Sequence, residues 1–279
     1  MPTTPDSFPQ RNRFTPVTDR LIGEKPKTKT SRYWEVDTLR GMATILMVFY
    51  HLVWDLSYFG ALEPNMSSRP WRWFAHSIAT IFIFVLGISL VLSYTRAGQA
   101  AGFQKYLRRG SKIFATGLII TLVTYLFLGQ EFVVFGVLHV IGFSIIAAYP
   151  LLPYRHCRVC LIVGVVSIGL GIYLNGQVSP TPWFIWLGVS QAGRSMVDYY
   201  PVLPWFGVAL VGIYAGHALY PGGMSRFALP DKSGTPVVRG LSFLGRHSLF
   251  IYLIHQPILL GILILLGIGS SRLPLAAVK

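Results

Sequence analysis

The stretch that decides the fold is RYWEVDTLRGMATILMVFYHLVWDLSYFG, residues 32–60. From residue 42 onward it is largely apolar, with close to the roughly 20 residues that an α-helix needs to cross a hydrocarbon core about 30 Å thick. Ionisable side chains nevertheless stand at its start and inside it. A charged group at mid-membrane costs about 2.5–3.5 kcal/mol even on the insertion scale, so such groups usually mark function.

The rest of the chain repeats the apolar pattern. Of its 279 residues 53% are hydrophobic and only 12% are charged, whereas soluble domains carry about 25% charged residues. We predict an all-α, polytopic membrane bundle of about seven transmembrane helices, at about 42–60, 73–94, 112–129, 132–152, 159–175, 202–220 and 241–268. The tryptophan-rich segment 180–192 is shorter and is expected to lie at the membrane interface.

We expect three regions along the chain. Residues 1–31 are polar and basic, which predicts a disordered tail. Residues 32–268 form the transmembrane domain, and 269–279 form a short C-terminal tail. The two cysteines, Cys157 and Cys160, are interpreted as packing residues without a disulfide framework.

Lysine and arginine are distributed unevenly between the two sides of the predicted bundle. Nineteen lie in the N-terminal tail and in the loops on its side, and five lie in the opposite loops. By the positive-inside rule the N-terminus is therefore cytoplasmic. The net charge of +14 accordingly serves topology and contact with the anionic lipid bilayer, and it does not predict a nucleic-acid partner.

The polar residues of the first helix share one face. At about 100° per residue, Asp37, Arg40, Thr44, His51 and Asp55 fall within an arc of about 60°. This arrangement predicts a polar seam facing the bundle interior. The opposite face carries apolar side chains: Ile45, Phe49, Leu52 and Leu56.

The seam favours a catalytic interpretation. His51 is expected near mid-bilayer, and Asp55 lies one helical turn beyond it, close enough to hydrogen-bond the imidazole and leave its other nitrogen as a base. Arg40, beside Asp37, stands at the cytoplasmic entrance and suits a phosphate group. The alternative is structural: Asp37 caps the helix, Arg40 reaches lipid phosphate, and His51 pairs with a neighbouring helix.

Three further residues are secondary candidates, each with a structural alternative. His139 and His255 lie within later apolar segments, where a histidine can also serve as an interhelical hydrogen-bond partner. Arg246 lies near the cytoplasmic end of the last segment and suits either CoA phosphates or lipid headgroups. Glu131 and Asp198 in the outer loops are interpreted as solvated acids that could contact an acceptor. The sequence has no nucleotide-binding loop and no zinc-like cluster, so we expect no bound cofactor and no metal.

Four segments together resemble the bacterial branch of the heparan-α-glucosaminide N-acetyltransferase catalytic-domain family. They are EVDTLRGMATILMVFYHLVWDL (35–56), FIFVLGISL (82–90), VVFGVLHVIGFS (133–144) and LGRHSLFIYLIHQPIL (244–259). The spacing of Arg40 and His51 also resembles the arginine–ten residues–histidine pattern of the wider transmembrane acyltransferase superfamily.

The resemblance implies an acyltransferase that passes an acyl group, usually acetyl, from cytoplasmic acyl-CoA to a carbohydrate or similar cell-envelope acceptor at the outer face. It implies that His51 is the catalytic histidine and that Arg40 binds the donor. In the lysosomal enzyme the proposed active histidine follows the first helix, and asparagine stands at the position of His51. Here the following loop has no histidine before His76, so the lysosomal substrate and acetyl-histidine chemistry cannot simply be transferred. Two roles of His51 stay open: it deprotonates the acceptor for direct attack, or it carries the acyl group transiently.

Two other functions remain open at this point. Intramembrane histidine, aspartate and arginine also build proton relays, so a proton-coupled transporter is the main alternative. A non-catalytic membrane assembly protein is the second. In each case the chain is expected in a membrane, the bacterial inner membrane in the interpretation favoured by the resemblance.

Overall fold

The computed structural model describes residues 33–98, 102–154, 158–193, 196, 198–227 and 230–268. Six of its helices are long and apolar enough to cross a membrane, and α4 is a shorter apolar helix. The predicted all-α, polytopic class is thereby confirmed. The expectations for 1–31 and 269–279 fall on residues outside the described ranges. The helices are α1 (Trp34–Tyr58), α2 (Arg69–Ala97), α3 (Phe103–Leu128), α4 (Val137–Ala147), α5 (Arg158–Asn175), α6 (Val202–Leu219), α7 (Pro236–Arg246) and α8 (Ser248–Leu265).

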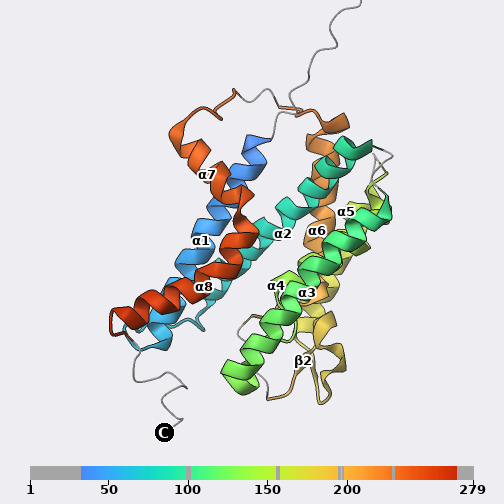
Figure 1. Cartoon of the computed structure of the whole chain (residues 1–279). Coiled ribbons are helices and arrows are strands. Elements are labelled where there is room, and N and C mark those ends of the chain that lie inside the picture. The colour runs from blue at the N-terminus through green and yellow to red at the C-terminus, as the bar shows by residue number, and fades with distance from the viewer. Residues whose placement is uncertain are drawn as a thin grey trace, which may run out of the picture. The chain divides into compact units, whose positions relative to one another are not determined.

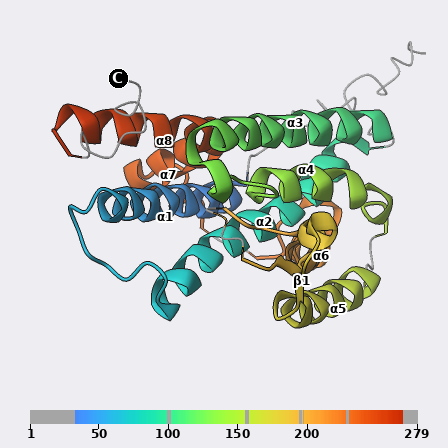
Figure 2. The ribbon, with the colours of Figure 1, turned by 90° about the horizontal axis from the view of Figure 1, so that it is seen from below.

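The most buried of the six long helices are α2 and α6, which pack closely on each other. Figure 2 shows α2, α4 and α6 in the middle, with α3 and α5 on opposite sides of them. Glycines permit the close approach, because a Cβ on Gly212 would collide with the backbone carbonyl of Phe84 on α2. Such small residues let transmembrane backbones approach closely. The central pair therefore forms the rigid part against which the other helices pack.

The expectation of one continuous span over 241–268 was wrong. The helical conformation is interrupted at His247 (φ −102°, ψ 11°), and this interruption separates α7 from α8. Figure 1 shows α7 beside the first half of α1 and α8 continuing along the second half. A Cβ on Gly245 would collide with the carbonyl oxygen of Asp37, so α7 lies nearly backbone to backbone with α1. A straight helix could not keep this contact and also follow the direction of α8.

The fourth predicted span is shorter than expected. Instead of 132–152, the α-helix covers only Val137–Ala147 and is followed by a 3₁₀ turn, η4 (Tyr149–Leu151). Segment 180–192 does not span, as expected: it holds a 3₁₀ helix, η5 (Pro182–Leu187), flanked by two short parallel strands. These are β1 (Val178–Ser179) and β2 (Ser190–Gln191).

The covalent state of Cys160 differs from the prediction of a packing cysteine without a disulfide. Cys160 is fully buried at the start of α5, but it is disulfide-bonded. Cys157 lies outside the described residues. The apolar surroundings of the segment therefore predicted the burial of Cys160 and not its covalent state.

Candidate active site

The polar seam of α1 faces the interior, as predicted. Thr44 is 1% exposed and Asp55 is fully buried, whereas Ile45 and Phe49 on the opposite face are about half exposed. The Thr44 hydroxyl donates to the Arg40 carbonyl at 2.9 Å, which satisfies this buried polar group within its own helix. Arg40, His51 and Asp55 of the seam contact side chains of other helices.

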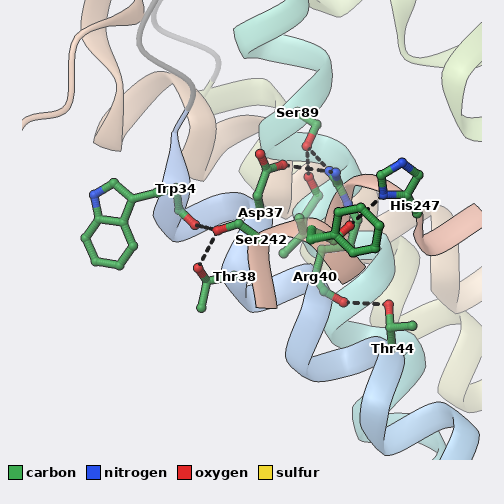
Figure 3. Close-up of polar contacts among 10 residues, drawn as sticks. Trp34, Asp37, Thr38, Arg40, Thr44, Ser89, Ser242 and His247 are labelled. Atoms are coloured by element: carbon green, nitrogen blue, oxygen red, sulfur yellow. Dashed lines mark hydrogen bonds and ion pairs between the residues drawn. The ribbon is translucent and has the colours of Figure 1, made fainter. Parts of the chain in front are cut away.

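Arg40 lies between two helices. Its Nη2 donates to Ser89 Oγ of α2 at 2.5 Å, and its Nη1 lies 3.6 Å from Asp37 Oδ1 (Figure 3). The charge of Arg109 at the start of α3 also acts on Arg40. Two guanidinium groups near each other repel, and a bound anion relieves that repulsion. This corner therefore has the charge and the donor geometry for a phosphate group.

The second half of α7 is fixed to α1 beside this corner. Ser242 Oγ and Thr38 Oγ1 share a hydrogen bond of 3.1 Å, and Ser242 also reaches the Trp34 carbonyl at 3.5 Å (Figure 3). Arg246 is exposed on the last turn of α7. The structure thus brings α7 to the donor side of the seam, whereas the side chain of Arg246 itself stays at the surface.

The hydrogen bond of His51 defines its tautomer. Nδ1 lies 2.9 Å from the carbonyl oxygen of Met47, one turn earlier in the same helix. Because a carbonyl oxygen only accepts, Nδ1 must carry the proton, and Nε2 of the neutral ring then holds a lone pair. No described residue hydrogen-bonds this Nε2. The imidazole is therefore oriented with its basic nitrogen away from the backbone of α1.

His255 of α8 faces His51. The two ring centroids lie 4.7 Å apart and the rings meet nearly edge to face, at 77°. His255 Nδ1 donates to the Tyr252 carbonyl at 2.7 Å, and its Nε2 is buried without a partner among the described residues. The same tautomer argument applies to both rings. The secondary candidate His255 and the main candidate His51 thus form one pair between α1 and α8.

The predicted hydrogen bond between His51 and Asp55 is not formed. Asp55 Oδ1 instead accepts from Gln256 Nε2 of α8 at 2.6 Å. Asp55 Oδ2, Gln256 Oε1 and His255 Nε2 are all buried without a partner among the described residues. Buried polar atoms are almost always hydrogen-bonded, and a cluster of exceptions points to a bound group or to water. These three polar atoms between α1 and α8 therefore remain without hydrogen-bond partners among the described residues.

His139 is not part of this pair. Its Nδ1 accepts from the Gly136 amide at 3.1 Å, its Nε2 lies 3.5 Å from Thr121 Oγ1, and its ring packs edge to face on Phe114. Both ring nitrogens are thus engaged at the start of α4. The geometry supports the structural interpretation of His139 as a residue that holds the end of a helix.

The environment of Asp198 differs from the one that the sequence predicted. It was expected to be a solvated loop acid, but its side chain is only partly exposed and its Oδ2 accepts from the Val137 amide at 3.3 Å. Burial raises the pKa of its carboxyl group to about 6, an effect that the hydrogen bond from Val137 opposes. Its charge also acts on Tyr50 of α1 and Tyr252 of α8, which flank the histidine pair. An acid followed by two tyrosines before an apolar run was the available signal.

A family comparison agrees with this geometry. Residues 32–257 match the model of the family described as heparan-alpha-glucosaminide N-acetyltransferase, catalytic. The chain belongs to this family. No curated protein and no solved structure shows a significant match. Membership in a heparan-alpha-glucosaminide N-acetyltransferase family, together with the apolar helices, identifies an integral, multi-pass membrane acetyltransferase.

Proposed function

We propose that the protein transfers an acyl group, in the first instance acetyl, from cytoplasmic acyl-CoA to a hydroxyl or amine of a carbohydrate-like acceptor at the outer face. The observation that carries the proposal is the His51–His255 pair, with ring centroids 4.7 Å apart inside the bundle. Both rings present Nε2 as the basic nitrogen because Nδ1 is held by a backbone carbonyl. A positioned imidazole base contributes about 10²–10⁴-fold to a proton-transfer step.

The donor side of the proposal depends on Arg40. His51 lies eleven positions after Arg40, which is about 16 Å along a helix axis. A phosphate-bearing donor bound at Arg40 and Arg109 would extend its thiol arm along the seam of α1 toward the histidines. Asp37 holds the guanidinium of Arg40 in position. Acyl-CoA enters this scheme as a co-substrate, and no resident cofactor is needed.

The transfer step needs one base and one leaving group. Nε2 of His51 removes the proton from the acceptor hydroxyl or amine as its oxygen or nitrogen attacks the thioester carbonyl. The new acyl–oxygen or acyl–nitrogen bond forms, the carbon–sulfur bond breaks, and the CoA thiolate receives the proton from the imidazolium. Asp55 and Gln256 bridge α1 and α8 and keep the two rings facing each other.

We further propose that the membrane is the bacterial plasma membrane and that the N-terminal end of α1 faces the cytoplasm. The bias of lysine and arginine toward that side supports this orientation. The donor corner at Arg40 would then open to the compartment that holds acyl-CoA, and the loop from 176 to 201 would face outward.

The test is acetyl transfer by purified protein in nanodiscs, with radiolabelled acetyl-CoA. We expect His51→Ala to lower the rate of thioester consumption about 10²–10⁴-fold, with unchanged folding. Phe49→Ala is the matched control, because this side chain lies on the same helix but is half exposed on its opposite face. A folded His51→Ala protein with wild-type turnover would refute the catalytic role. Proton movement into vesicles without thioester consumption would instead favour a transporter.

A further inference from the structure

The segment around Asp198 is held in place by three hydrogen bonds, two to residues 135–137 and one to η5. The Tyr200 amide donates to the Phe135 carbonyl at 2.9 Å. The Tyr199 hydroxyl donates to the Ile185 carbonyl at 2.8 Å, and Asp198 Oδ2 accepts from the Val137 amide at 3.3 Å. A loop side chain fixed in this way is already positioned before any ligand arrives, so it loses little conformational entropy on binding.

The carboxyl group of Asp198 lies close enough to the helices that carry the histidine pair to interact electrostatically with their tyrosines. Its charge acts on Tyr50 of α1, on Tyr252 of α8 and on Tyr200. The ring of Tyr50 lies 5.6 Å from that of His51, and the ring of Tyr252 lies 5.8 Å from that of His255. Tyr50 and Tyr252 therefore each interact with the carboxylate and lie next to one of the two imidazoles.

The carboxylate has unused hydrogen-bonding capacity. An ionised carboxylate can accept about four hydrogen bonds, and Asp198 accepts one from the described residues, the long bond from Val137. Among those residues no lysine or arginine pairs with it. The titratable groups that interact with its charge are the phenols of Tyr50 on α1, Tyr252 on α8 and Tyr200 in its own loop. From α4 it meets the Val137 amide, next to the cap formed by His139.

We propose that Asp198 is an acceptor-binding residue, which accepts hydrogen bonds from hydroxyl or amine groups of the acceptor and holds it on the side of the histidine pair away from Arg40. This inference rests on the proposed function and adds a preference for the charge of the acceptor. A buried negative charge favours neutral or cationic acceptors and disfavours acidic ones. The raised pKa of Asp198 agrees with it, because a ligand that donates hydrogen bonds would stabilise the ionised form.

Binding of probe sugars to the purified protein tests the proposal without turnover. The probes are methyl glucoside, glucosamine and glucuronate, titrated into wild-type protein and Asp198→Asn. Asparagine keeps an oxygen for the Val137 amide but removes the charge, so a merely structural role would leave sugar binding unchanged. The control is Glu131→Gln, because Glu131 is an exposed acid in the turn after α3.

We expect Asp198→Asn to weaken binding of glucosamine and methyl glucoside at least tenfold, and to leave the Kd of acetyl-CoA unchanged. The wild-type protein should bind glucuronate least, and wild-type affinity for methyl glucoside should fall below about pH 6 while that of Asp198→Asn stays constant. Equal sugar binding by the folded variant, or no binding of any probe by wild type, overturns the proposal. Retained sugar binding without thioester consumption would refute the proposed acyl transfer alone.

Discussion

Replacing Gly245 by alanine should push α7 away from α1. An added Cβ would lie 2.9 Å from the carbonyl carbon of Asp37 and 3.0 Å from the Gly41 amide nitrogen, and closer still to the Asp37 oxygen. Carbon atoms in ordinary contact lie about 3.5–4.0 Å apart. Because the opposing atoms belong to the backbone, no side chain can move aside. The two helices must therefore separate by about 1 Å.

Separating α7 from α1 lowers the free energy of unfolding. It would stretch the hydrogen bond between Thr38 and Ser242 from 3.1 Å to about 4 Å, beyond hydrogen-bonding range. The loss is about 1 kcal/mol, and overpacking adds about 1–3 kcal/mol. Gly240 lies on the same helix with open space around its Cβ position. Since both variants gain the same helix propensity, Gly245→Ala should be less stable than Gly240→Ala by about 2–4 kcal/mol.

Thermal unfolding in nanodiscs, followed by tryptophan fluorescence, measures this difference. For a chain of this size about 2 °C corresponds to 1 kcal/mol, so Gly245→Ala should melt roughly 4–8 °C below Gly240→Ala. Binding of acetyl-CoA should weaken as well, because Asp37 and Arg40 shift with the displaced backbone. Equal melting temperatures for the two alanine variants would show that α7 does not pack against α1 as described.

Three further changes test the polar groups. Arg40→Lys should raise the KM for acetyl-CoA about 10-fold or more, because lysine lacks the planar fork that bonds a phosphate while also contacting Ser89; steady-state kinetics checks this, and an unchanged KM contradicts it. Gln256→Ala should lower the unfolding free energy by about 1–3 kcal/mol, because it leaves the Asp55 carboxyl group buried without its partner, and equal melting of variant and wild type would refute that pairing. In the folded protein the pKa of Asp198 is about 6, above its usual value. The contribution of this residue to the stability of the fold is therefore fully present below about pH 4 and is lost as pH rises through 6. Asp198→Asn should therefore match wild type near pH 4 and exceed its stability by up to about 3 kcal/mol at pH 8, and a difference that does not change with pH excludes this origin.

The features that depend on one helix could be predicted from the sequence. Burial of Thr44 and Asp55 and exposure of Ile45 and Phe49 follow from the helical period alone. The break at His247 could not be predicted from hydropathy, because the run continues on both sides of it. The break depends on a contact between Gly245 and Asp37, which are 208 residues apart in the numbering.

The contacts of the site were harder to predict than its residues. Asp55 was expected to pair with His51 because the two lie four residues apart, but Gln256, 201 residues away, donates to it instead. The tertiary partner has an amide N–H that points at the carboxylate, whereas Nδ1 of His51 already bonds its own helix. Asp198 was undervalued for a related reason. A loop position gives no periodic signal, and its position depends on the hydrogen bond with Val137 of α4, 61 residues away.

The distance between α1 and its neighbouring helix changes along α1, from α7 to α8. This change explains how one helix can hold both Arg40, at the proposed phosphate site, and His51, in the histidine pair. Near Gly41 and Gly245 the backbones of α1 and α7 touch, so no side chain fits between them and Arg40 is directed toward α2. After the break at His247, α8 no longer approaches α1 through glycine, and Gly261 has nothing within contact distance of its Cβ position. Side chains must then fill the gap. In a wholly apolar bundle leucine would fill it, and a polar filling is less stable unless each group finds a partner or a ligand. The buried atoms left without partners on Asp55, His255 and Gln256 therefore lie in the part of the contact between α1 and α8 that no glycine holds close.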